Sequence, residues 1–394
     1  MNRFDIIKLR NIFFLALIII SICFGCRKKG CTDPNADNYD PDAIKEYNST
    51  CVYTDFNKSE MLNNICDNYI VPSYSNFNNQ TSSLKDQISI FSQSPTINNF
   101  ENIRNQWVQT LLSWQEVSFI DFGPAEYIIL KNQVNLYPVD TALIKKNINT
   151  GNYNLEFASN YDAKGLQALD FLLFQPNMSN QQHVDYFNNS TNAMSYLINI
   201  SNDLNINSQY IVDQWHSYKT TFKNNSETNA QGSSVSNLIN GLCSYYETYI
   251  RKGKIGLPLG IFNGFSQQEM PELVECYYYG ESLPFAKRAM ESMREYINGV
   301  SYISKTNSLG FDDYMDFVGA AQNETTLSSV ITNQIELILN ELNQLNDPLS
   351  NEIANNKPAV NNCYSKMQQL VPYTKVDMTS ALGVLITYQD NDGD

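Results

Sequence analysis

The sequence predicts an all-α protein, because apolar residues recur at intervals of three and four along most of the chain after residue 56. One such stripe is formed by Ile103, Trp107, Leu111, Trp114 and Val117. Similar stripes run through residues 286–297 and 327–345. This spacing places the apolar side chains on one face of each helix, where they can form the core of a helical bundle. Strict alternation of apolar and polar residues between turn signals is lacking, so a sheet protein is not expected.

The first 25 residues are typical of an export signal. Arg3, Lys8 and Arg10 precede an apolar run that ends at Phe24, and Gly25-Cys26 follows. This order of basic, apolar and small residues marks a secretory signal. The apolar run is shorter than the roughly 20 residues that a membrane-spanning helix needs. A small residue directly before a cysteine is the bacterial lipobox pattern, so we expect cleavage before Cys26 and lipidation of this cysteine.

Residues 26–55 are expected to form a spacer between the lipid and the folded protein. Arg27, Lys28 and Lys29 suit a tether over anionic headgroups, which favours an outer-membrane lipoprotein facing the periplasm. Cys31 and Cys51 bracket a polar loop, and in an oxidising compartment we expect a disulfide between them. The acidic residues of this loop do not make a calcium site of the EF-hand type, since the turn glycine and the last glutamate of such a loop are missing.

A polar break divides the helical part of the chain. Residues 223–234 read KNNSETNAQGSS and separate two stretches with helical periodicity. We therefore predict two helical-bundle domains, residues 56–225 and 226–394, with a groove at their interface.

Composition excludes several classes of function. The formal net charge of −15, without a basic stripe, disfavours nucleic acid as a partner. The two histidines, His183 and His216, stand alone, and the metalloprotease motif HExxH does not occur. The four cysteines after residue 51 contain no CxxC pair, so zinc-ribbon and thioredoxin-type sites are not expected. The disulfide pairing of these four cysteines is left open; they are Cys66, Cys243, Cys276 and Cys363.

Three segments contain glycine and proline in positions where a bundle needs neither. The first is 121–124, with Gly123 and Pro124, and the second is 136–140, where Pro138 and Asp140 are expected at a helix start. The third is 251–260, which packs three glycines and a proline into a short stretch. Segments of this kind often shape the rim of a pocket.

The segment KGLQALDFLLF, residues 164–174, carries the most distinctive polar pair. If it is helical, Gln167 and Asp170 are three residues apart and share one face, while leucines occupy the other face. An amide and a carboxylate on a helix with an apolar back would point into a cleft. The alternative is a partly exposed pair at the edge of the bundle.

These segments together resemble the imelysin family, also called peptidase family M75, over roughly residues 75–390. The shared features, in order, are the tryptophan-containing helix that runs into DFGP, the element YPVD at 137–140, GLQALD at 165–170, YETYIRKGKIGLPLG, PELVECYYYGES and LGVLITYQDNDGD. The resemblance implies an all-helical protein of two bundle-like domains with a groove where they meet. It also implies an envelope lipoprotein associated with iron or other metal uptake, and a family named for a peptidase activity.

The chain departs from the family's GxHxxE-type motif at the two residues that matter most. Gly165 matches, but Gln167 stands where the family has histidine, and Asp170 stands where it has glutamate. An amide is a poor ligand for a transition metal and is no general base. Further ligands could come from four glutamates in matching stretches, and an oxygen-only site would prefer calcium, magnesium or ferric iron over zinc. These candidate ligands are Asp170, Glu116, Glu126, Glu247 and Glu275.

Three functional hypotheses follow. The first is a non-catalytic imelysin-like envelope lipoprotein that binds a metal species or small ligand at the domain interface, with Gln167 and Asp170 in the wall and Gly123, Pro124 and residues 251–260 at the rim. The second is a module that binds carbohydrate or an envelope partner protein through Tyr277, Tyr278 and Tyr279. The third is an M75-type peptidase, for which no complete set of catalytic residues can be assembled. No cofactor is assigned beyond a divalent or ferric metal ion.

Overall fold

The computed structural model describes residues 28–34, 36–44, 51–52 and 55–389, which belong to two compact units, Met1–Asn57 and Lys58–Asp394. In the first unit, Cys31 and Cys51 form a disulfide. Lys28 pairs with Asp40 at 2.8 Å within the same unit. The predicted export signal and Cys26 lie outside the described residues.

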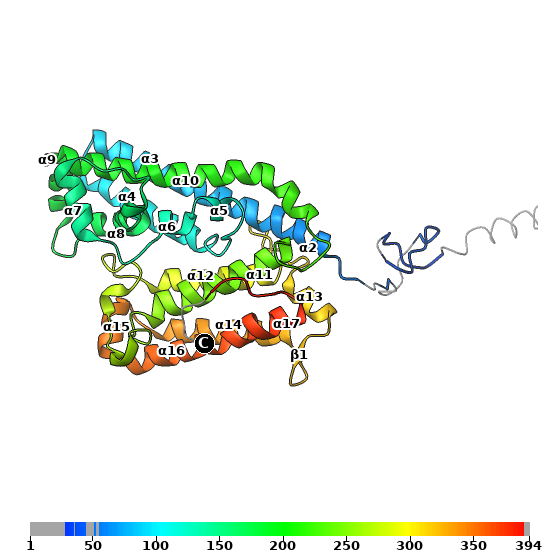
Figure 1. Ribbon diagram of the computed structural model, residues 1–394. Helices are drawn as coiled ribbons and strands as arrows, with labels where there is room; N and C mark the ends of the chain where they lie inside the picture. Colours follow the sequence, from blue (N-terminus) through cyan, green and yellow to red (C-terminus); the bar gives the residue numbers. More distant parts are fainter. Residues whose placement is uncertain (1–27, 35, 45–50, 53–54, 390–394) are drawn as a thin grey trace, which may run out of the picture. The chain divides into compact units, whose positions relative to one another are not determined.

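The second unit is built mainly from helices (Figure 1). Its α-helices are α2 (Lys58–Asn64), α3 (Val71–Gln93), α4 (Ile97–Gln115), α5 (Pro124–Tyr127), α6 (Leu130–Val134), α7 (Thr141–Thr150), α8 (Gly165–Leu173), α9 (Asn180–Asn189), α10 (Thr191–Asn224), α11 (Ser234–Tyr245), α12 (Leu283–Ile297), α13 (Phe311–Phe317), α14 (Leu327–Gln344), α15 (Leu349–Asn355), α16 (Lys357–Val371) and α17 (Thr379–Ala381). Wider π-helical turns occupy Ile65–Ile70, Tyr246–Gly256 and Pro372–Met378, and 3-10 turns occupy Ala158–Ala163, Gly264–Ser266 and Pro271–Leu273.

The predicted apolar stripes form the core of this unit. Helix α4 is capped at its start by Thr96, whose side chain accepts a hydrogen bond from the backbone amide of Asn99 at 3.3 Å. Its stripe is fully buried against α3, and α3 packs in turn on α10. The stripes of α12 and α14 are buried as well, and α14 also packs on α16. Contacts between α4 and α12 join the two halves of the chain.

The polar break predicted at residues 223–234 interrupts the helices where expected. Helix α10 ends at Asn224, and α11 begins at Ser234. Residues 58–394 nevertheless form a single compact unit, so the division into domains 56–225 and 226–394 stays a prediction.

Several local predictions need correction. Asp140 caps α7 as expected by accepting from the backbone amide of Leu143 at 2.9 Å, but Pro138 precedes the helix and follows a cis peptide bond. Much of the glycine-rich stretch 251–260 continues the π-helical segment Tyr246–Gly256 instead of forming a loop. A two-stranded hairpin, β1 (Ala321–Gln322) and β2 (Thr325–Thr326), provides the sheet content of the described residues. Within these residues, no helix has both the length and the apolar character that crossing a membrane requires.

Candidate functional site

A cavity of about 200 Å³ opens beside helix α8, and we call it the α8 cavity. Its wall comes from the segment that leads into α7, from α8 itself, and from the 3-10 turn Pro271–Leu273 with the segment that follows it. The lining residues are Tyr137, Pro138, Val139, Thr141, Gln167, Asp170, Glu272, Val274, Tyr277 and Tyr278. The two polar residues singled out from the sequence therefore lie together in one cavity wall, as the helical spacing predicted.

Glycine at position 165 allows α8 to begin where it does. Its φ of +75° lies in the left-handed region that glycine tolerates. A Cβ atom at this position would lie 2.4 Å from the carbonyl oxygen of Val134, so any side chain would push α8 away from α6. The preceding residue, Lys164, is buried and donates to Gln133 Oε1 at 2.8 Å and to Asp203 at 3.1 Å. These contacts fix the start of α8 and hence the direction of its polar face.

Gln167 binds the backbone of the opposite wall. Its Oε1 accepts from the backbone amide of Cys276 at 3.0 Å, and its Nε2 donates to Asn135 Oδ1 at 2.8 Å. Cys276 has a φ of +60°, which is uncommon for a residue with a side chain. The amide oxygen thus holds a strained turn, while the amide nitrogen connects that turn to Asn135, so Gln167 uses both an acceptor and a donor.

Asp170 binds the same segment two residues further along. Its two carboxylate oxygens accept from the backbone amides of Tyr278 at 3.0 Å and Tyr279 at 2.8 Å. The side chain is 1 % exposed, and burial raises the pKa of Asp170 to about 7. The two amides oppose this shift in pKa, and the nearby charge of Glu275 adds to it. Asp170 is therefore a carboxyl group that changes charge near neutral pH.

A buried ion pair lies behind this wall. Lys254 Nζ contacts Glu275 Oε2, and both side chains are almost fully buried. The other oxygen of Glu275 accepts from Asn135 Nδ2 at 2.7 Å and from Gln115 Nε2 at 3.1 Å. Because Asn135 also bonds to Gln167, one continuous polar network connects Gln167 to the ion pair. Sequence reasoning missed Asn135, Gln115 and Lys254; the one signal was a lysine between glycines in an otherwise apolar stretch.

The five carboxylates considered as metal ligands do not meet at one place. Glu116 accepts from Arg288 at 2.8 Å, and Glu247 pairs with Lys375 at 3.1 Å. Glu126 lines a different cavity, of about 370 Å³. Among the described residues, no group of three or more His, Cys, Asp or Glu side chains is placed to hold a metal ion. The expected convergence on Asp170 does not occur, because each of Glu116, Glu247 and Glu275 is bound to a basic side chain of its own.

The donor atoms of the α8 cavity also fit a bare metal ion poorly. Both oxygens of Asp170 and the oxygen of Gln167 already accept hydrogen bonds from backbone amides. Each of these oxygens keeps a lone pair beyond the one that a backbone amide takes, but three such atoms fall short of the roughly six to eight oxygen ligands that a hard cation such as calcium takes. A site for an unchelated ion is therefore not supported by the residues of this wall.

The other expected rim residues lie apart from the α8 cavity. Gly123 has a φ of +55°, and a Cβ atom there would meet the ring of Tyr218 at 2.7 Å, so this glycine permits close packing on α10. Pro124 follows at the first position of α5. Part of the stretch 251–260 lines a cavity of about 170 Å³ that shares Tyr137 and Pro138 with the α8 cavity.

Comparison with known proteins gives a consistent result. The model of the imelysin family, peptidase family M75, matches residues 70–371. A solved structure from Parabacteroides distasonis, described as a "putative iron-regulated protein A precursor", is similar with a TM-score of 0.67 and 16 % identity, over 82 % of this chain and 95 % of that one. An imelysin-like protein from Psychrobacter arcticum is similar with a TM-score of 0.62 and 15 % identity, over 84 % and 97 %. No curated protein matches the sequence significantly.

Proposed function

The chain belongs to the imelysin family, and from this premise we propose that it is a non-catalytic envelope lipoprotein that binds a small ligand in the α8 cavity. One observation carries the proposal: the two residues at the family's motif positions, Gln167 and Asp170, both face this cavity. The wall also combines residues before and after the polar break at 223–234, in keeping with a groove between two predicted domains.

The ligand that we propose is a metal species that arrives with its own ligands, such as a ferric chelate. A relative of known structure is described as iron-regulated, and we carry this connection with iron over to the present chain as part of the proposal. A chelate suits the wall better than a bare ion does, because a chelate presents oxygen atoms and bound water to the protein. Such groups can bond to the remaining lone pairs of Asp170 and to the protonated form of this carboxyl group.

We further propose that the chain is lipidated at Cys26 and faces the periplasm from the outer membrane. In this arrangement the disulfide-closed segment 26–55 is a spacer, and an envelope partner protein would receive or deliver the ligand. Mass spectrometry of the mature N-terminus tests the anchor. An N-terminus other than an acylated Cys26 would contradict it.

Calorimetric titration of the full chain with ferric citrate, and with citrate alone, tests the cavity. The double variant Gln167→Ala, Asp170→Ala should bind at least about tenfold more weakly, because two polar groups of the wall are lost. The matched control is Gln181→Ala, Asp185→Ala on exposed helix α9, where the two side chains bond to each other at 2.8 Å. Affinity equal to wild type in the first double variant would remove the α8 cavity as the site.

A second variant separates binding from folding. Thr141 lines the cavity at the start of α7 and takes no part in the polar network, so Thr141→Trp should fill the cavity while leaving the network intact. We expect lost binding with a thermal unfolding midpoint close to wild type. Chelator-sensitive cleavage of peptides by the pure protein, abolished in Asp170→Asn, would instead support a peptidase.

A further inference from the structure

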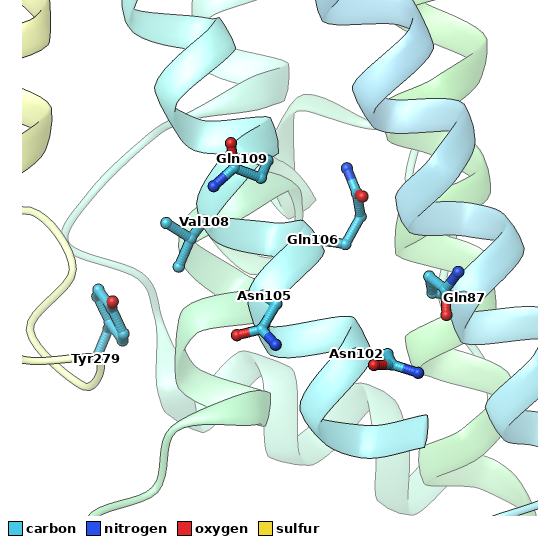
Figure 2. A pocket seen from close by; sticks show the side chains of 7 residues that line it. All are labelled: Gln87, Asn102, Asn105, Gln106, Val108, Gln109 and Tyr279. Atoms are coloured by element: carbon cyan, nitrogen blue, oxygen red, sulfur yellow. The ribbon is translucent and has the colours of Figure 1, made fainter. Parts of the chain in front are cut away.

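An open groove of about 530 Å³ lies along helix α4 and shares no lining residue with the α8 cavity. We call it the carboxamide groove, after five of its lining side chains. The lining residues are Gln87, Asn102, Asn105, Gln106, Val108, Gln109 and Tyr279. Figure 2 shows α4 between α3, which carries Gln87, and the loop that carries Tyr279.

The floor of the groove is a stripe of carboxamides along one helix. Asn102, Asn105, Gln106 and Gln109 are spaced by three and four residues, so their side chains project from one face of α4. An exposed helix face usually mixes acidic and basic residues. Here none of the described residues that line the groove is charged. The groove is thus polar but electrically neutral.

Among the residues that the structure describes, most of these carboxamides have no hydrogen-bond partner. Gln106 Nε2 donates to Gln80 Oε1 at 2.7 Å. The side chains of Asn102, Asn105, Gln109 and Gln87 make no hydrogen bond to any part of the chain that the structure describes. Each carboxamide offers two donors and an acceptor oxygen. Four such groups face one groove with their hydrogen-bonding capacity available to a ligand.

An aromatic wall completes the groove. The ring of Tyr279 lies 5.5 Å from the ring of Trp107 and 4.8 Å from that of Phe174, measured between centroids. Its hydroxyl donates to Glu281 at 3.2 Å, and its backbone amide donates to Asp170. These contacts fix the orientation of a half-buried ring before any ligand arrives, which lowers the entropy lost on binding.

We propose that the carboxamide groove binds a neutral oligosaccharide. Neighbouring hydroxyl groups of a sugar both donate and accept hydrogen bonds. A carboxamide can pair with both, because its NH₂ group donates and its oxygen accepts. The ring of Tyr279 can pack on the apolar C–H face of a sugar ring. Groove volumes of about 300–1,000 Å³ are usual for small-ligand sites. A formal net charge of −15 and a neutral lining disfavour acidic glycans.

A protein partner fits the groove less well. The cores of protein interfaces are built from well-packed apolar and aromatic anchors. In this groove Val108 and Tyr279 are the only such side chains among the described lining residues, and they stand at one side of the carboxamide stripe. Binding of peptides or proteins in place of glycans is therefore treated as an outcome that would overturn the proposal.

The test uses the full chain on an array of neutral and acidic oligosaccharides, followed by calorimetric titration with the neutral glycan that binds best. The double variant Asn105→Ala, Gln109→Ala should weaken binding at least about tenfold, since two side chains that bond to the sugar are removed. Its matched control is Asn340→Ala, Gln344→Ala, the same pair at the same spacing on the exposed face of α14. This control should bind as wild type does.

A change at Tyr279 separates the ring from its hydroxyl. Tyr279→Phe keeps the ring and should change affinity less than about threefold, because the hydroxyl is directed to Glu281. Three results would overturn the proposal: no neutral glycan bound at millimolar concentration, selective binding of acidic glycans or peptides, or unchanged glycan affinity in Asn105→Ala, Gln109→Ala.

Discussion

The walls of the α8 cavity and of the carboxamide groove use similar polar groups in opposite ways. Around the α8 cavity, the amide of Gln167 and the carboxylate of Asp170 are buried and bonded to backbone atoms of the opposite wall. In the groove, the carboxamides of Asn105 and Gln109 are exposed and without partners among the described residues. The first set of groups holds the structure together, whereas the second set is available for a ligand.

The two regions meet at one short segment. Asp170 accepts from the backbone amides of both Tyr278, which lines the α8 cavity, and Tyr279, which lines the groove. The motif position of α8 therefore helps to place a residue of the groove. Burial explains the contrast between the regions. A polar group without a hydrogen-bond partner lowers the stability of the fold strongly when it is buried, and only slightly when water can bond to it.

The buried ion pair behind the α8 cavity should give the largest effect on stability. Replacing Lys254 by methionine leaves the carboxylate of Glu275 buried without its cation, which typically costs about 3–5 kcal/mol. Urea unfolding should show this loss in Lys254→Met. The matched control is Lys357→Met, whose partner Glu269 is partly exposed, and here we expect about 0–1 kcal/mol.

A second variant tests the cause of that loss. Lys254→Met combined with Glu275→Gln removes both charges and keeps an acceptor oxygen for Asn135 and Gln115, so much of the lost stability should return. A cost below about 1 kcal/mol for Lys254→Met alone would mean that water reaches the pair, and the contrast between buried and exposed polar groups would fail.

Asp170 should give the next largest effect, as a dependence of stability on pH. Its pKa is raised from 3.8 to about 7 in the folded chain. Between these values the folded chain keeps a proton that the unfolded chain has released, so stability should fall as pH rises, by at most about 1.4 kcal/mol per pH unit. This contribution is fully present below pH 3.8 and is lost as the pH rises through 7.

The measurement compares the unfolding free energies of wild type and Asp170→Asn from pH 4 to 8. The difference between the two should change steadily up to about pH 7 and then level off, while Asp185→Asn on the exposed face of α9 should follow wild type. A constant difference would show that Asp170 titrates in its ordinary range in the folded chain, and a change in the opposite direction would show that folding lowers its pKa.

The features predicted from the sequence are those that depend on residues close together in the chain. The apolar stripes of α4, α12 and α14 follow from helical periodicity alone, and all are buried. The shared face of Gln167 and Asp170 follows from a spacing of three residues. The need for glycine at position 165 could be suspected, although the carbonyl of Val134 that enforces it could not be identified.

The features that could not be predicted depend on pairs far apart in the sequence. Gln167 binds a backbone amide 109 residues away, and Glu116 and Glu247 meet their basic partners at separations of 172 and 128 residues. A carboxylate in a matching motif stretch looks the same in the sequence whether it binds a metal or a lysine. The carboxamide stripe of α4 could be read from the sequence, but Gln87 and Tyr279, which make it a groove, come from other segments.

The smallest effect on stability should come from the groove. Asn105→Ala, Gln109→Ala should change the free energy of unfolding by less than about 0.5 kcal/mol, since neither side chain bonds to the described chain. Any change should be a slight gain, because alanine favours the helix more than asparagine does. Urea unfolding of this variant beside Asn340→Ala, Gln344→Ala checks the expectation.

This last variant separates the two roles of polar groups most clearly. If the carboxamides serve a ligand alone, glycan affinity should fall while stability stays constant, the reverse of the pattern expected for Lys254→Met. A loss of more than about 1 kcal/mol in stability would mean that Asn105 and Gln109 support the fold through water or through neighbours. The groove would then belong to the same class as the wall of the α8 cavity, and its unpartnered carboxamides would no longer argue for a ligand.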